Sequence, residues 1–488
     1  QGEISEHSRQ VLEGAYRFVR RVENIIQALA DQQTQTLPDN ELDQARILYV
    51  LGDEQFPTWQ AFLNYLYRLM QGVHQEFNVL IGEESPHHQA QDQHWATLWD
   101  SLWDEQESIE WIAQAQPQWP AEKMWQLLKS FRNDSKKRSI GSRGRQVLDK
   151  LIPLLLSYLA SLQADETALE RILLIIDKVS TRTAYLELLY ENEGALKHLV
   201  KLCQISQWVA EHIIKYPILL DELIDPTLLN TPPALSSYAE HLRESLLRVP
   251  EEDLEAQMEF LRQFKQAQQL RIAVADIVGV LPITKVSDHL TALAQAIVGE
   301  VINMAWQQIA QRYGVPSSIA ELDHKGFAAI GYGKMGGVEL GYSSDLDLVF
   351  IHNCATDDVT NGIKQVSAGQ FYAKLAQRIM HIFNARMSSG ILYELDMRLR
   401  PSGNSGLLVV HIDSFEKYQN DEAWTWEHQA LVRTRAIYGH EALQAQFTTI
   451  RQRILTKKRD ITALKTAVID MRNKMQSHLD KSTETASD

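Results

Sequence analysis

Three aspartates in the last third of the chain have the spacing of a metal-binding site. Asp345 and Asp347 stand two residues apart at the start of an apolar run over residues 346–351, which is rich in strand-forming residues. Because side chains alternate along a strand, the two carboxylates point to the same face, where they repel each other unless a cation lies between them. Asp396 can add a third carboxylate from a neighbouring strand over residues 391–399. We expect these aspartates to bind Mg²⁺ beside the phosphates of a nucleotide.

A glycine-rich segment from Gly331 to Gly337 precedes the aspartates. Its G-x-G-x-x-G pattern matches the fingerprint of dinucleotide-binding folds, but that interpretation needs a crossover helix and an acidic residue about 20 positions further on. Only residues 338–345 separate the glycines from the next predicted strand, and Ile351 stands where the acidic residue should be. We therefore place Gly336 and Gly337 at the start of a short helix, where their backbone N–H groups can approach a triphosphate.

Five polar side chains beside these motifs are candidates to contact the nucleotide: Ser343, Ser344, Lys334, Arg398 and Arg400. The two serines can donate hydrogen bonds to phosphate oxygens, or they can serve an ordinary turn. The three cations can neutralise the charge of the triphosphate. For Arg398, an ion pair with Glu394 or Glu339 is the alternative.

The elements that must position these residues differ from those that precede them. Residues up to about 310 show the three- and four-residue steps of amphipathic helices, with few glycines and prolines. After Pro316 the pattern changes to short apolar runs, and a helical stripe over residues 365–387 lies between the second and third of them. The predicted strands are residues 327–333, 346–351, 391–399 and 407–411. The sequence thus predicts a small unit of strands and helices attached to a helical body.

Breaks in the pattern predict five segments along the chain. They are a helical segment over residues 1–80, linker helices over 81–165, a helical domain over 166–310, a catalytic core over 311–455 and the start of a further helical region over 456–488. Basic residues between Lys136 and Arg145 are expected in a solvated loop between two helices.

Composition excludes several classes of protein. The chain has 48 basic and 63 acidic side chains, a net charge of −15, which argues against nucleic acid or an anionic membrane as a partner. Its two cysteines, Cys203 and Cys354, fit a reducing compartment and exclude a disulfide scaffold. No apolar run is long enough to span a membrane, and no export signal is visible. We expect a cytoplasmic protein of several domains, and the missing initial Met suggests a fragment of a longer chain.

The motifs resemble a known group of enzymes. The order Gly336-Gly337, Asp345-x-Asp347, Asp396 resembles the signature of polymerase-β-like nucleotidyltransferases. Three longer strings resemble glutamine synthetase adenylyltransferase, a bifunctional family with two related nucleotidyltransferase halves. They are GYGKMGGVELGYSSDLDLVFIH (331–352), SSGILYELDMRLRPSGNSG (388–406) and EAWTWEHQALVRTRAIYG (422–439). Residues 180–203 and 216–226 resemble the helices before the core of the half that attaches AMP, and residues 17–38 resemble the helical tail of the half that removes it.

The resemblance implies an α+β, mostly helical fold, in which helical bundles flank a small polymerase-β-like nucleotidyltransferase core with a mixed sheet. It implies an Mg²⁺-dependent enzyme that moves AMP from ATP to a tyrosine of glutamine synthetase, releases pyrophosphate and so regulates nitrogen assimilation. Asp345 and Asp347 would then bind two Mg²⁺ ions, while Asp396 would complete the catalytic ion site and help to deprotonate the tyrosine. A PII-type signalling protein would be a further partner.

Two alternatives stay open. Phosphorolytic removal of AMP from the same protein would use the same metal chemistry and would yield ADP instead of pyrophosphate. A non-catalytic regulatory or docking fragment is the second alternative, because no upstream Gly-Gly and Asp-x-Asp pair occurs and the chain stops at Asp488, where the family continues into another helical bundle. Nucleic-acid polymerisation shares the signature but is opposed by the net charge of −15 and by the lack of a basic groove.

Overall fold

The computed structural model describes residues 6–30, 37–38, 40–52, 56–66, 69, 87–100, 104–224 and 232–484. The chain divides into two compact units, Gln1–Thr97 and Leu98–Asp488. The predicted boundary between residues 80 and 81 lies outside the described residues. Among the residues described, no helix has both the length and the apolar character needed to cross a membrane.

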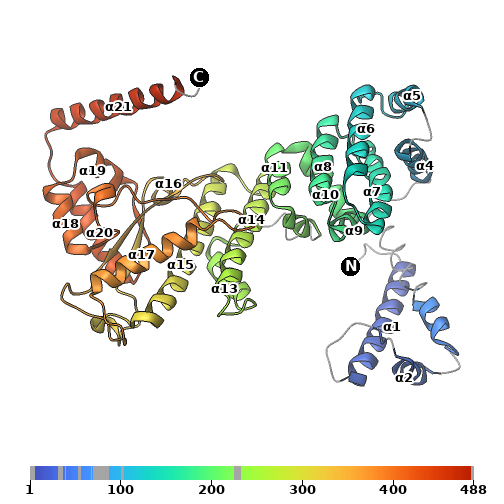
Figure 1. The fold of residues 1–488 in the computed structure, drawn as a ribbon, viewed down its shortest axis with the longest axis horizontal. Helices are drawn as coiled ribbons and strands as arrows, with labels where there is room; N and C mark the ends of the chain where they lie inside the picture. Colours follow the sequence, from blue (N-terminus) through green and yellow to red (C-terminus); the bar gives the residue numbers. More distant parts are fainter. Residues whose placement is uncertain are drawn as a thin grey trace. The chain divides into compact units, whose positions relative to one another are not determined.

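The first unit is helical and has a small apolar core. It contains α1 (Glu6–Ala30), α2 (Glu41–Leu51) and helical residues 59–66, drawn in blue in Figure 1. Val22 and Ile26 lie one turn apart on α1 and are buried with Ile47 and Leu51 of α2. The four-residue spacing of the first pair places both side chains on one helix face, as the sequence pattern predicts.

Helices also make up the first half of the second unit, and α4 (His87–Asp100) crosses the division between the units. The next helices are α5 (Glu105–Ala115), α6 (Ala121–Lys137), α7 (Ser142–Ser161), α8 (Glu166–Val179), α9 (Thr183–Glu191), α10 (Glu193–Ile205), α11 (Gln207–Lys215), α13 (Tyr238–Leu246), α14 (Leu254–Ile277) and α15 (Ile283–Tyr313) (Figure 1). Helix α8 shows why such segments fold as they do. Asp165 accepts a hydrogen bond from the N–H of Ala168, and Leu169, Ile172 and Ile176 form one fully buried face.

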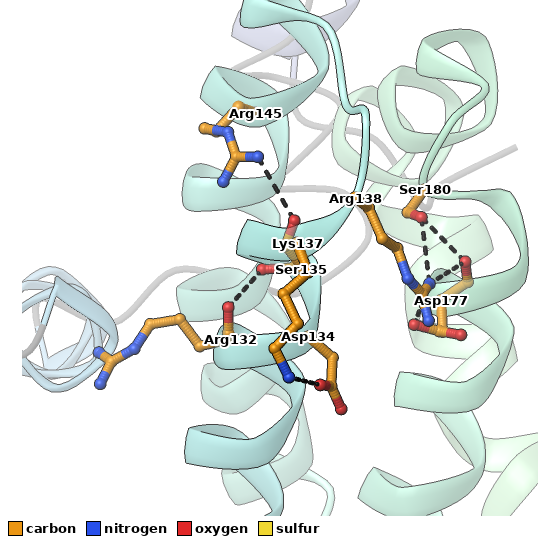
Figure 2. Close-up of polar contacts among 8 residues, drawn as sticks. All are labelled: Arg132, Asp134, Ser135, Lys137, Arg138, Arg145, Asp177 and Ser180. Carbon is orange, nitrogen blue, oxygen red and sulfur yellow. Dashed lines mark hydrogen bonds and ion pairs between the residues drawn. The ribbon is translucent and has the colours of Figure 1, made fainter.

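The basic residues between α6 and α7 are held more firmly than expected (Figure 2). Only residues 138–141 separate the two helices, so the predicted solvated loop is wrong in extent. Arg138 donates to the backbone oxygen of Asp177 at 2.8 Å and forms an ion pair with the carboxylate of the same residue. Arg145 reaches back to the carbonyl oxygen of Ser135 at 3.3 Å. The cluster therefore joins α6 and α7 to α8.

The second half of this unit contains a five-stranded mixed sheet. Its strands are β1 (Phe327–Gly331), β2 (Leu346–His352), β3 (Leu395–Asp396), β4 (Val409–His411) and β5 (Arg435–Tyr438). Its helices are α16 (Gly333–Gly336), α17 (Ala368–Asn384), α18 (Ile412–Asp421), α19 (Thr425–Val432), α20 (Glu441–Leu455) and α21 (Ile461–Glu484). The strand order is β3-β2-β1-β5; β1 pairs antiparallel with β2 and β5, whereas β3 and β4 pair in parallel with the same edge of β2. A mostly helical α+β fold with a mixed sheet is confirmed.

Two details of the predicted sheet are wrong. The expected strand over residues 391–399 is reduced to the two residues of β3, because β4 occupies the rest of the β2 edge. Strand β5 was not predicted, and its four residues show no clear alternation of polar and apolar side chains. The predicted helix over 365–387 is three residues shorter at each end.

Both faces of the sheet are covered, which explains why its central strands are almost continuously apolar. Leu346, Leu348 and Phe350 of β2 lie in the core shared with α15 and α17. Val349 and Ile351 alternate to the other face and pack in the core shared with α18 and α20. Asp347 points to the same face as Val349 and Ile351, because side chains alternate along the strand, but it lies at the beginning of β2.

Helix α14 anchors the loop that leads into β3. Arg262 is fully buried, and its guanidinium donates to the backbone oxygens of Ile382, Ala385 and Gly390 at 2.6 to 2.9 Å. One turn further along the helix, Lys265 donates to the backbone oxygen of Leu392 at 2.7 Å. These bonds hold the loop as far as Leu392, four residues before the third aspartate.

Replacing Arg262 by methionine should destabilise the second unit by about 3 kcal/mol, because the buried carbonyl oxygens would lose their donor. The matched control is Arg271→Met on the same helix, which removes a partly exposed ion pair with Glu222 and should cost at most about 1 kcal/mol. Chemical denaturation followed by circular dichroism measures both. Equal losses in the two variants would contradict the anchoring role.

Candidate active site

The structure brings the three predicted aspartates together. Each of Asp345, Asp347 and Asp396 offers a carboxylate oxygen, and these oxygens lie within 4.8 Å of one another. Asp347 and Asp396 are direct partners in the parallel pairing of β2 and β3. Asp345 is exposed just before β2, and the other two are partly buried. Three oxygen donors so close together suit a hard divalent cation.

The charges in this cluster are balanced unequally. Burial raises the pKa of Asp347, and the nearby carboxylates of Asp345 and Asp396 raise it further. Arg398 donates through its backbone N–H and its guanidinium to Asp396, with the Nε–Oδ2 distance at 2.8 Å, and this holds the pKa of Asp396 below its usual range. Among the described residues, Arg398 forms its ion pair with Asp396, whereas Glu339, one of the two predicted alternative partners, pairs with Arg433. Arg398 and Lys334 offset these effects at Asp347 only in part, so its negative charge stays unfavourable and a cation would relieve it.

A glycine that the sequence analysis did not select lets Asp347 take this position. Gly333 has φ +51°, and a Cβ atom there would overlap the Oδ2 atom of Asp347. The backbone N–H of the preceding residue, Tyr332, donates to the backbone oxygen of Asp347 at 2.9 Å. The glycine-rich turn is thus packed directly against the carboxylate. The sequence signal for this glycine is the G-x-G-x-x-G pattern of residues 331–336.

The prediction for Gly336 and Gly337 needs correction. They lie at the end of the four-residue helix α16, not at its start, and their N–H groups donate to the carbonyl oxygens of Tyr332 and Gly333. A Cβ at Gly336 would overlap the carbonyl oxygen of Arg433. The absence of a side chain therefore serves close packing of the turn, and a contact of these glycines with nucleotide stays a prediction.

Two cavities meet at Asp345 and Glu394. The α14 cavity, about 410 Å³, is lined by α11, α14 and the segment Tyr342–Asp345 and contains Ser343 and Ser344. The β3 cavity, about 440 Å³, is lined by Asp396 and the loop after it. Both volumes are in the range of small-molecule sites.

The remaining predicted residues are divided between these places. Ser344 serves a turn, since its Oγ accepts the N–H of Gly341 at 2.9 Å, and Ser343 is exposed. Arg398 and Arg400 line the β3 cavity, but the buried Arg400 donates to the carbonyl oxygens of Met397 and Asn404 and so holds its own loop. Lys334, Gly336 and Gly337 are not in the lining of either cavity. Lys334 is nevertheless close enough to Asp347 to lower the pKa of that residue.

Comparison of the sequence with known families identifies the enzyme family to which this part of the chain is similar. A family model described as glutamate-ammonia ligase adenylyltransferase matches residues 196–450, more than half of the chain. The chain belongs to this family. The matched range contains the whole sheet and all three aspartates. Because glutamate-ammonia ligase is glutamine synthetase, the adenylyltransferase family acts on glutamine synthetase, and the resemblance found in the sequence is confirmed.

A second family model, described as GlnD PII-uridylyltransferase, matches residues 1–81. It covers most of the first compact unit, Gln1–Thr97. Residues 1–81 are thus similar to part of another nucleotidyltransferase family. Their assignment to the tail of an AMP-removing half stays a prediction.

Gly333→Ala should weaken binding of Mn²⁺, used as a probe of the cluster, by about tenfold, because the new Cβ displaces the Asp347 carboxylate and strains the backbone by about 1–2 kcal/mol. The matched control is Gly341→Ala, where the nearest atom to the new Cβ, Ser344 Oγ, is 3.6 Å away. Electron paramagnetic resonance of free Mn²⁺ gives both affinities. Unchanged affinity in Gly333→Ala would show that this glycine does not shape the site.

The α14 cavity also contains a histidine whose protonation opposes folding. Burial lowers the pKa of His212 to about 4, and Lys265 and Lys215 lower it further, against a raising effect of the Gln266 backbone. Between the ordinary value of 6.5 and about 4, the unfolded chain binds a proton that the folded chain does not. Stability should therefore fall as pH decreases through this window.

His212→Gln should reduce this loss, so its denaturation midpoint should fall less than that of the parent between pH 6.5 and pH 4. His381→Gln, at an exposed position of α17, is the control and should follow the parent. Urea denaturation across the pH series measures the difference. Parallel curves for parent and His212→Gln would contradict a buried, neutral imidazole.

Proposed function

We propose that this chain transfers AMP from ATP to a tyrosine of glutamine synthetase, with release of pyrophosphate. The observation that carries the proposal is the cluster of Asp345, Asp347 and Asp396 inside the range that matches the adenylyltransferase family. The control of nitrogen assimilation follows from the substrate. The two buried thiols, Cys203 and Cys354, fit a cytoplasmic location.

Two Mg²⁺ ions, held by Asp345, Asp347 and Asp396, would supply charge to activate the attacking oxygen and to stabilise the departing pyrophosphate. The chain's own residues provide the orientation. Asp345 lies where the two cavities meet, so the α-phosphate of ATP would lie beside it, with the tyrosine entering from the β3 cavity. Lys334 is close enough to Asp347 to lower its pKa and would contribute positive charge to the phosphates.

Arg398 has a second task in this scheme. Its side chain is 73% exposed, so it is free to turn from Asp396 toward the phosphates when ATP arrives. Loss of this pair would let the pKa of Asp396 rise toward its ordinary value, because the pair is the main cause of its depression. An Asp396 carboxylate freed in this way would accept the proton of the tyrosine hydroxyl at an Oδ atom.

We also propose a PII-type signalling protein as a partner. The match of residues 1–81 to a family whose name includes PII supports the first unit as its place of binding. We also propose the division of the chain into linker helices over residues 81–165, a helical domain over 166–310 and a catalytic core over 311–455.

Mixing the chain with unmodified glutamine synthetase, ATP and Mg²⁺ should add AMP to a tyrosine, detected by intact mass and peptide mapping. Asp345→Asn with Asp347→Asn should lose the activity by at least about a thousandfold, because removing the charge-stabilising groups of a transfer site costs several kcal/mol. The control is Asp323→Asn, which changes an exposed aspartate outside the cluster.

The products separate the alternatives. Pyrophosphate supports attachment, whereas ADP formed from phosphate and already modified glutamine synthetase supports removal. ATP binding without either product would favour a regulatory or docking fragment. Equal activity in the double variant and the parent would exclude the aspartate cluster as the site of transfer.

A further inference from the structure

Two polar atoms in the lining of the α14 cavity lack a partner among the described residues. They are the Oε1 atom of Gln266 and the hydroxyl of Tyr342, and both are buried. Gln266 is only 2% exposed. Unpaired buried polar groups are rare because each is costly, so two of them in one cavity indicate that a molecule with hydrogen-bonding groups belongs there.

The walls of the cavity are aromatic. The ring of Trp208 stacks on His212 with 4.5 Å between centroids and lies 4.6 Å from the ring of Tyr342. Burial lowers the pKa of His212 to about 4, so its imidazole is neutral near pH 7. Flat rings combined with neutral donors and acceptors suit a heteroaromatic base better than a charged group.

The two lysines that line the cavity, Lys265 and Lys215, are compatible with binding of an uncharged base. The ammonium group of Lys265 donates to the carbonyl oxygen of Leu392 and lies 4.1 Å from the ring centroid of Tyr393. It is thus already bound to the protein. Lys215, the other lysine of the cavity, is exposed and lies beside the acidic Glu211.

The cavity is continuous with the aspartate cluster. Ser343, Ser344 and Asp345 form part of its lining. Gln269 of α14 fixes this segment, since its side-chain amide donates to the backbone oxygen of Tyr342 at 3.2 Å. A base held between α11 and α14 would therefore extend its sugar and phosphates toward Asp345.

We propose that the α14 cavity binds the adenine base of ATP, with the side-chain amide of Gln266 pairing with its amino edge. A glutamine amide offers an acceptor beside a donor, which matches the amino group and the adjacent ring nitrogen of adenine. The inference rests on the proposed function, because the base is that of the ATP whose α-phosphate lies at the cluster. It makes Gln266, His212 and Tyr342 the residues that select the nucleotide.

The test compares Gln266→Leu with Gln268→Leu in the full chain. Gln268 is a matched control because it is also buried on α14, and its Oε1 atom also lacks a partner among the described residues, but it lines a different cavity. Calorimetric titration with adenosine, ATP and inorganic tripolyphosphate, the last two with Mg²⁺, gives the affinities. Gln266→Leu should weaken adenosine and ATP by about tenfold or more and leave tripolyphosphate unchanged, while Gln268→Leu should match the parent.

A second variant keeps the test decisive if Gln266→Leu does not fold. Tyr342→Phe retains the ring and removes only the unpaired hydroxyl, and it should weaken adenosine in the same direction by a smaller factor. Unchanged adenosine affinity in both variants would overturn the base site, and so would a parent chain that binds tripolyphosphate but not adenosine.

The two proposals fail in different ways. A chain that binds adenosine through Gln266 but adds no AMP to glutamine synthetase would overturn the proposed transfer and support the base site. A chain that adds AMP with the same KM for ATP in Gln266→Leu as in the parent would overturn the base site and support the transfer.

Discussion

The geometry of the site depends on a strand pairing only two residues long. Asp347 and Asp396 lie side by side because Leu346 and Asp347 of β2 pair in parallel with Leu395 and Asp396 of β3. So short a pairing gives few hydrogen bonds, and the carboxylates that it brings together repel each other. The register must therefore be imposed from outside the sheet. Arg262 of α14 does this by binding backbone oxygens of the last turn of α17 and of the loop between α17 and β3.

This constraint explains an unusual row of buried polar residues on one helix. Arg262, Gln266 and Gln269 of α14 are no more than 3% exposed and follow the spacing of a single helix face. Charged and amide side chains are seldom fully buried unless they are paired or serve a ligand. Arg262 donates to the loop and Gln269 to the segment before Asp345, whereas the Oε1 atom of Gln266 has no partner among the described residues. One face of α14 therefore positions both chain segments that lead to the aspartates, the loop before β3 and the segment before Asp345.

Much of the site follows from local pattern, and the rest does not. Asp345, Asp347 and the two central strands could be predicted because alternation along a strand is a property of neighbouring residues. The true length of β3 could not, since it depends on β4 taking the other half of the β2 edge. Gly336 and Gly337 were placed at the wrong end of α16 because the motif alone does not show which N–H groups the turn already uses.

The role of α14 in positioning the loop before β3 could not be predicted from the sequence, for a different reason. Its contacts join Arg262 to residues 120 to 128 positions away in the chain. Helical periodicity distinguishes a buried face from an exposed one, but it does not show which distant loop a buried arginine binds. A glutamine-rich helix such as α14 also resembles a surface helix by composition. Only the folded chain shows that these amides are buried.

The unequal charges in the cluster suggest an order of events. Asp396 is already balanced by Arg398, so it gains little from a cation until that arginine leaves. Among the described residues Asp347 shows no comparable ion pair, and both its burial and its acidic neighbours make its ionised form unfavourable. A cation binding first at Asp345 and Asp347 would therefore remove the larger electrostatic cost. The phosphates of ATP would then offer Arg398 a second anion, and its departure from Asp396 would free the third carboxylate only when substrate is present.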